Sequence, residues 1–156
     1  MPFSQPLASL LLACALLPFP AFTVSAAELP LDRYNRVDIA DAKTSIYIGS
    51  ITMKLPPFVR ENGVYTATYE AKVFPFFFQN ESGTLSIEIP DETLRALERG
   101  EVIHFTGRAH NDDGEERHVE GRAIPDGPNS LSGSIKVRVF VSKKIQLIFN
   151  TTYRFL

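Results

Sequence analysis

The 156-residue chain contains no tryptophan, one cysteine and two methionines. The cysteine is Cys14, within an apolar N-terminal stretch, so a chain processed after that stretch has neither a disulfide nor a thiol nucleophile. Its stability must then come from packing. With two methionines, the sequence also offers little for an adaptable, methionine-rich binding groove.

The chain also lacks a large net charge of either sign. Sixteen Lys and Arg face 18 Asp and Glu, which gives a formal net charge of −2. A nucleic-acid-binding domain normally shows a strongly basic balance, so we predict no nucleic-acid partner. At 44% hydrophobic and 22% charged residues, the composition is that of a folded globular protein.

Charge is absent altogether from the first 27 residues. An apolar run at residues 7–17 is followed by two prolines and by small residues that fit cleavage after Ala26 or Ala27. We therefore predict a signal peptide at residues 1–27 and an exported protein, either periplasmic, in the cell envelope or extracellular. The open alternative is an uncleaved anchor, since residues 7–27 are barely long enough to span a bilayer.

A second alternative concerns Cys14. The sequence Leu-Leu-Ala-Cys that ends there resembles the lipobox of bacterial lipoproteins, in which the cysteine receives the lipid. The residues after Cys14 stay apolar up to Ala27, however, whereas the tether beyond a lipidated cysteine is usually polar. Lipidation of Cys14 therefore remains an alternative to processing near Ala27.

The clearest pattern in the chain is a pair of alternating runs at residues 133–141 and 145–155. Apolar side chains such as Ile135 and Val137 in the first run, and Phe149 in the second, recur at every other position. A period of two that is rich in β-branched and aromatic residues predicts strands with one buried face. Three residues separate the runs, so we expect an antiparallel hairpin.

The rest of the chain shows the same period in shorter runs. We predict further strands at residues 45–55, 64–73, 84–89, 101–109 and 116–123, with a short edge strand around residues 36–40 as a further candidate. One helix is predicted at residues 91–99, with Asp91 as its cap, Leu94 and Leu97 on its buried face and Gly100 as its stop. We expect this helix to pack as a lid over one end of the sheet.

These elements predict an all-β fold. We expect a single antiparallel β-sandwich or small β-barrel of seven to eight strands with one short helix, at residues 43–156. A lead-in segment at residues 28–42 precedes it.

No motif for catalysis or cofactor binding is present. The sequence has no Gly-x-Ser-x-Gly and no glycine-rich phosphate loop. We therefore predict no catalytic residues, no cofactor and a protein that is not an enzyme; an active site assembled from distant residues is kept as a residual alternative.

Three histidines on one predicted hairpin invite a metal-site interpretation. His104 and His110 share a face but lie roughly 20 Å apart along the strand. Regular pairing places His118 on the opposite face from His104, although a bulge at Gly114 could change this. No cysteine or close His-x-His pair completes a zinc set, so we predict no metal site. The acidic stretch at residues 111–116 is explained by an Asp-Gly hairpin turn rather than by calcium binding. Arg117 is expected on a solvated face of mixed charge.

A candidate surface for a partner or a ligand is the aromatic segment Phe74, Phe76, Phe77 and Phe78. If exposed, such a cluster marks a surface for a partner or a membrane; if buried, it is core. The most pointed functional indication is the end of the chain, Tyr153-Arg154-Phe155. The last eleven residues resemble the terminal strand of bacterial outer-membrane β-barrels, which commonly ends in an aromatic residue, but they depart from it by the extra Leu156.

We therefore predict an exported, non-catalytic β-domain that acts as a binding module or as a structural module of the envelope, with an unknown protein or apolar ligand as its partner. Membrane association stays open. The alternatives are a small β-barrel carrier of an apolar ligand and a small integral outer-membrane β-barrel.

Overall fold

The computed structural model describes residues 30–156, and the expected signal peptide and the lipidation of Cys14 lie outside the described residues. The strands are β1 (Arg36–Ile39), β2 (Ala42–Ile46), β3 (Gly49–Lys54), β4 (Phe58–Glu61), β5 (Val64–Phe74), β6 (Glu81–Glu88), β7 (Ile103–Asn111), β8 (Glu116–Pro125), β9 (Ser132–Phe140) and β10 (Gln146–Phe155). The helix α1 spans Asp91–Glu98, and two 3₁₀ turns, η1 (Leu31–Tyr34) and η2 (Phe77–Gln79), complete the described part.

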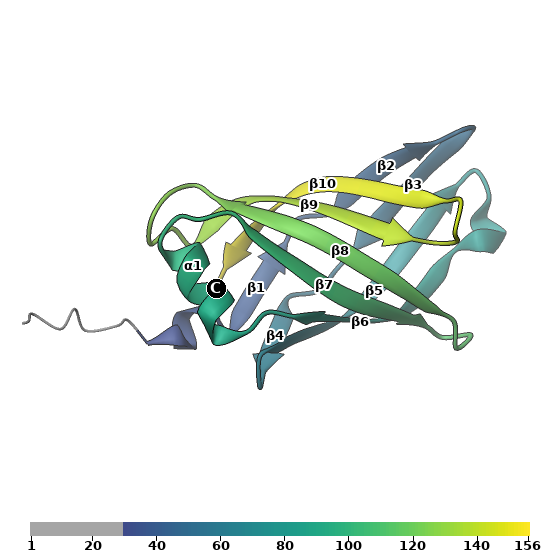
Figure 1. The fold of residues 1–156 in the computed structure, drawn as a ribbon. Coiled ribbons are helices and arrows are strands. Elements are labelled where there is room, and N and C mark those ends of the chain that lie inside the picture. Colours follow the sequence, from purple (N-terminus) through teal and green to yellow (C-terminus); the bar gives the residue numbers. More distant parts are fainter. Residues whose placement is uncertain (1–29) are drawn as a thin grey trace, which may run out of the picture.

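Eight of the strands close into an antiparallel barrel (Figure 1). Their order is β5-β4-β1-β10-β9-β8-β7-β6, and β6 pairs back to β5 along most of its length. The short strand expected around residues 36–40 is β1, but it is not an edge strand as predicted, because it pairs with both β4 and β10 and so completes the ring. The prediction of an all-β small barrel is confirmed, and of its two forms the closed barrel is the one adopted.

The β2–β3 hairpin extends the wall beyond this ring. One edge of the long strand β5 is shared, because its first residues pair with β4 and its last residues, from Glu70 to Phe74, pair with β3. The prediction of one strand at residues 45–55 is wrong, since the chain turns at Tyr47 and Ile48 and pairs Ile46 with Gly49. The turn residues are themselves apolar and keep the alternation going, so no change of pattern marks the turn.

The C-terminal hairpin is as predicted. β9 and β10 pair from Phe140 with Gln146 to Ser132 with Arg154, and Ile135, Phe149 and Tyr153 are buried inside the barrel. Inward and outward residues alternate along these strands because successive side chains of a strand point to opposite faces. The barrel interior is therefore the apolar core.

One end of the barrel is closed by α1 (Figure 1). Leu94 and Leu97 of this helix are fully buried, and the left-handed conformation of Gly100 (φ +86°) ends it, both as predicted. The predicted cap is wrong: Pro90 occupies the N-cap position, and the Asp91 carboxylate instead accepts a hydrogen bond of 2.6 Å from Arg60. The helix thus forms a lid that is held to the barrel by packing and by this ion pair.

Candidate functional site

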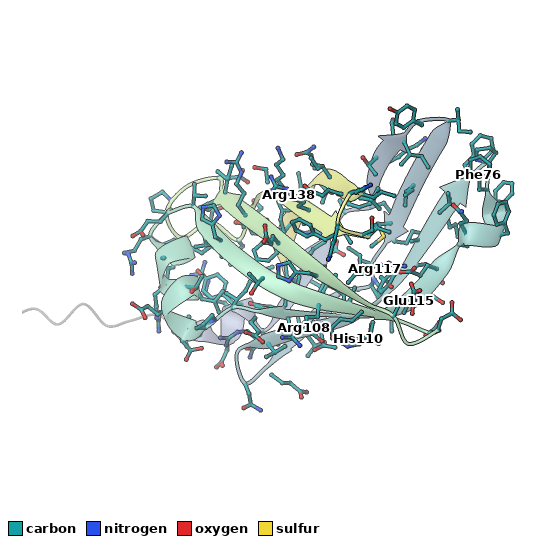
Figure 2. All side chains as sticks on the ribbon, turned by 45° about the vertical axis from the view of Figure 1, so that its right-hand side comes forward. Phe76, Arg108, His110, Glu115, Arg117 and Arg138 are labelled. Carbon is teal, nitrogen blue, oxygen red and sulfur yellow. The ribbon has the colours of Figure 1, made fainter. Side chains whose placement is uncertain are left out.

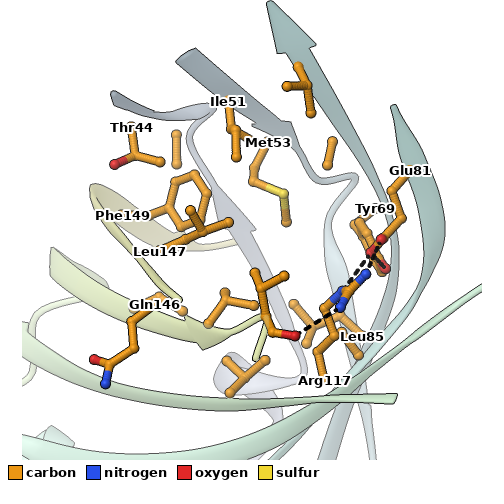
Figure 3. A pocket seen from close by; sticks show the side chains of 18 of the residues that line it. Thr44, Ile51, Met53, Tyr69, Glu81, Leu85, Arg117, Gln146, Leu147 and Phe149 are labelled. Carbon is orange, nitrogen blue, oxygen red and sulfur yellow. Dashed lines mark hydrogen bonds and ion pairs between the residues drawn. The ribbon is translucent and has the colours of Figure 1, made fainter. Parts of the chain in front are cut away.

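The barrel contains a cavity of about 1010 Å³ (Figure 3). Inward-facing side chains from both halves of the sheet line it, including Ile51 and Met53 of β3, Leu85 of β6, and Leu147 and Phe149 of β10. This volume lies at the upper end of the range of roughly 300–1,000 Å³ that is typical of small-molecule sites. The interior is thus large enough for a ligand of substantial size.

The cavity exists because large and small inward residues are unevenly distributed along the barrel. Toward α1 the interior is filled by aromatic rings: Tyr34 meets Phe155 edge to face with centroids 4.8 Å apart, and Phe105 packs over Gly121. A Cβ at Gly121 would lie 2.1 Å from the Phe105 ring, so that ring fits only above glycine. Farther along the same strands the inward residues become small, as at Ala109, and space remains.

The other end of the cavity opens to solvent between three loops. Tyr47 and Ile48 at the β2–β3 turn, Phe78 of η2 and Ile145 of the β9–β10 turn all line the cavity and are all exposed. These residues are apolar at positions where turns normally carry polar ones. This part of the entrance is therefore apolar, whereas Asp113 and Glu115 of the β7–β8 turn also line the cavity and are exposed.

The wall beside this entrance is incompletely hydrogen-bonded. The hydrogen bonds between β1 and β10 continue as far as Ala40. The Ala40 N–H donates to the Thr152 carbonyl at 3.0 Å, and the Thr151 hydroxyl donates to the Ala40 carbonyl at 2.8 Å. Beyond that point β2 is the edge of the ten-stranded sheet. Ala42 and Phe149 belong to a second apolar cluster here, so within residues 30–156 side-chain packing holds β2 against β10.

One polar cluster faces into the cavity (Figure 3). Arg117 of β8 donates to both carboxylate oxygens of Glu81, at 2.6 and 3.2 Å, and to Glu115 at 2.9 Å. Tyr69 also donates to Glu81, at 2.6 Å, and Asn111 does so at 3.3 Å. Because these residues come from four different strands and a turn, the cluster ties that side of the barrel together near its entrance.

The pKa values follow from these contacts. Burial alone would raise the pKa of Glu81, but hydrogen bonds from Arg117 and Tyr69 outweigh it and lower that pKa below its usual range. The hydrogen bonds to Glu81 raise the pKa of Arg117, and burial together with the bond to Glu81 raises the pKa of Tyr69. The cluster is thus an ionised Arg–Glu pair capped by a protonated phenol.

The inward direction of Arg117 corrects the prediction that it lies on a solvated outer face. Its side chain is 16% exposed and that of Glu81 is 21% exposed. Arg117 shares its strand face with the buried residues Val119 and Ala123, and this parity is the signal that identifies it from the sequence. With two carboxylates on its guanidinium, Arg117 is already neutralised and presents no spare positive charge to a ligand.

The three histidines all lie on the outer face of the barrel. The expectation that His118 lies opposite to His104 is wrong, because His118 pairs with Arg108, which shares the outward parity of His104 and His110. His110 contacts Glu116 at 2.9 Å, and His118 contacts Glu120 at 3.2 Å. Within residues 30–156, no three or more His, Cys, Asp or Glu side chains are grouped as a metal site would require.

The aromatic segment singled out from the sequence is mostly exposed. Phe74, Phe77 and Phe78 are 59%, 64% and 81% exposed, whereas Phe76 packs partly against the second apolar cluster. The rings pair edge to face, Phe74 with Phe77 at 5.8 Å and Phe76 with Phe78 at 5.9 Å. This segment lies at the entrance of the cavity, so the structure brings the predicted surface and the cavity together.

Comparisons with protein-family models, with curated proteins and with solved structures give no match for this chain. Among residues 30–156, neither α1 nor a 3₁₀ turn has the length and hydrophobicity to cross a bilayer as a helix.

Proposed function

We propose that this protein is a non-catalytic carrier that holds an apolar or amphipathic small molecule inside its barrel. The observation that carries the proposal is the cavity of about 1010 Å³, with aliphatic and aromatic walls, one end closed by α1 and the other end open. Ligand sites in small barrels have this form: a largely apolar hollow with a few convergent polar groups. Export is part of the proposal, because the charge-free segment at residues 1–27 has the features of a signal peptide.

The cavity favours a carrier over a purely structural module. Unfilled space inside a barrel costs stability, because the side chains that line it lose packing partners. A structural domain gains nothing from such a hollow, whereas a carrier needs it. The binding-module interpretation requires only an exposed surface and gives the hollow no role.

The distribution of polar residues favours a carrier over an integral outer-membrane barrel. A transmembrane barrel has an apolar outer band and a polar interior. Here the interior is apolar apart from the cluster around Arg117, and exposed charged or polar side chains such as His104, Arg108, Arg122 and Lys136 occupy the outer face. A bilayer core around these strands would have to bury those charges.

The chemistry of the ligand follows from the walls and from the polar cluster. An elongated hydrocarbon fits the aliphatic part of the cavity. Because Glu81 and Glu115 neutralise Arg117, the cluster favours an uncharged polar end, such as a hydroxyl, over a carboxylate. A long-chain alcohol is therefore a suitable test ligand.

The test is a displacement titration. A fluorescent alkyl probe is bound in detergent-free buffer and displaced by a long-chain alcohol, for the wild-type protein and for two variants at neighbouring positions. Leu147→Asp introduces a carboxylate at a cavity wall, and Ile148→Asp makes the same change at the next residue, which is 40% exposed on the outside. We expect Leu147→Asp to weaken binding roughly tenfold or more, because the ligand must strip water from a charge.

Ile148→Asp is expected to bind like the wild type, since its side chain does not line the cavity. The proposal is wrong if the wild-type protein fails to bind the probe, or if the two aspartate variants lose affinity equally. Circular dichroism of both variants checks that the barrel is intact.

A further inference from the structure

The entrance of the cavity is surrounded by exposed apolar side chains. We call them the aromatic rim: Tyr47, Ile48, Phe74, Phe77, Phe78 and Ile145. They come from the β2–β3 turn, the end of β5 with η2, and the β9–β10 turn, which gather at the end of the barrel away from α1 (Figures 1 and 2). Each is at least half exposed, and Tyr47 is fully so. An exposed apolar group of this kind on a folded domain marks an interaction surface.

The charges of the same three segments have one sign. Residues 42–53, 71–80 and 139–150 contain four lysines and no Asp, Glu, Arg or His, whereas Lys54, at the end of β3 away from the β2–β3 turn, pairs in register with Glu70. The four are exposed: Lys43, Lys72, Lys143 and Lys144. Carboxylates are concentrated instead in the β7–β8 turn, which contains Asp112, Asp113 and Glu115. The β2–β3–β5 and β9–β10 side of the entrance is therefore both apolar and basic in a chain whose net charge is negative.

We propose that this side of the open end docks on a lipid bilayer with anionic headgroups. The rings of the aromatic rim enter the interfacial layer, where amphipathic and aromatic side chains are stabilised. Lys143 and Lys144, next to Ile145 in the β9–β10 turn, lie against the lipid phosphates. A lysine close to an anionic membrane contributes roughly 1 kcal/mol of attraction, a factor of about five in affinity.

The charge pattern favours a bilayer over a second copy of this chain. A symmetric dimer through the aromatic rim would bring the lysines of one copy against the lysines of the other, with no carboxylate in these segments to pair with them. An anionic membrane complements both features at once, the exposed rings and the lysines.

Docking in this orientation goes beyond the carrier function and does not require it. It places the cavity entrance at the membrane, so that an apolar ligand passes between bilayer and barrel without crossing water.

The test is co-sedimentation of the protein with phosphatidylcholine vesicles that contain or lack phosphatidylglycerol. Phe77→Ser/Phe78→Ser removes two rings of the aromatic rim, and the matched control Val102→Ser/Leu131→Ser removes two exposed apolar side chains near α1. We expect the first variant to bind roughly tenfold more weakly or worse, because it loses apolar area that the bilayer would cover. The control is expected to bind like the wild type.

A second pair of variants tests the charge. Lys143→Ala/Lys144→Ala is expected to lower affinity for anionic vesicles about 25-fold, from about fivefold for each lysine. Lys136→Ala/Arg138→Ala, on the outer face of β9, is expected to change it far less. All four variants carry the same N-terminal segment, so any anchoring through Cys14 affects them equally.

The proposal is overturned if the wild type binds neither kind of vesicle, or if the rim variant binds as well as its control. It is also overturned if sedimentation velocity without vesicles shows a dimer that Phe77→Ser/Phe78→Ser abolishes, since the rim is then covered by a second copy. If the wild-type protein binds the probe but binds no vesicle, the docking alone is refuted. If the wild-type protein binds vesicles but not the probe, the carrier alone is refuted.

Discussion

Replacing Arg117 by methionine tests whether the inward-facing ion pair stabilises the open half of the barrel. Exposed ion pairs contribute up to about 1 kcal/mol, whereas breaking a buried pair costs about 3–5 kcal/mol. With its side chains 16% and 21% exposed, the Arg117–Glu81 pair lies between these limits but closer to the buried one. We expect Arg117→Met to lower the free energy of unfolding by about 2–3 kcal/mol, because Glu81 and Glu115 are left without their cation.

Urea unfolding at neutral pH measures this change as a lower midpoint with an unchanged slope. The matched control is Arg138→Met, which removes an arginine that is 44% exposed and 3.9 Å from Glu120. We expect the control to cost less than about 0.5 kcal/mol. Equal losses in the two variants, or no loss in Arg117→Met, would refute the reasoning that the inward pair matters because it is shielded from water.

Two further changes probe the same interior. Hydrogen bonds from Arg117 and Tyr69 hold the pKa of Glu81 below its usual range in spite of burial. Ionised Glu81 therefore stabilises the fold fully above its ordinary pKa of about 4.3, and this contribution is lost as the pH falls through the lowered pKa. The urea midpoint of Glu81→Gln is therefore expected to fall less steeply with acid than that of the wild type, and parallel curves would contradict this. Gly121→Ala places a Cβ 2.1 Å from the Phe105 ring and should cost about 1–3 kcal/mol by overpacking. The double variant Gly121→Ala/Phe105→Leu should recover part of that loss in thermal melts, whereas additive losses would show that the ring is not the cause.

The fold class was predictable because alternation in the long strands is strict. β7 buries every second residue, and β8, β9 and β10 alternate exposed residues with buried or partly buried ones along most of their length. The loops between these strands are short, so their order follows from pairing neighbours. The helix was predictable from Leu94, Leu97 and Gly100 in the same way. These features are local, and local periodicity is the signal that a single sequence carries best.

The candidate site was less predictable because it depends on which side chains from different strands meet inside the barrel. The inward position of Arg117 follows from parity with Val119, but its ion pair with Glu81 joins residues 36 positions apart in the chain. The central residues of the β2–β3 turn, Tyr47 and Ile48, are apolar, and its one turn residue, Gly49, already pairs with Ile46 in the ladder. The cavity volume is the volume enclosed by the sheet minus the volume of the inward side chains. A local sequence pattern does not reveal this difference.

The proposed carrier function depends most on the cavity being the ligand site. Backbone amide spectra recorded by nuclear magnetic resonance during titration with a long-chain alcohol test this directly. We predict saturable shifts at residues whose side chains line the cavity, such as Val119, Ile135 and Leu147, and little change at the outward-facing Lys136 and Ile148. Shifts confined to the outer face, or a spectrum that the alcohol leaves unchanged, would contradict it.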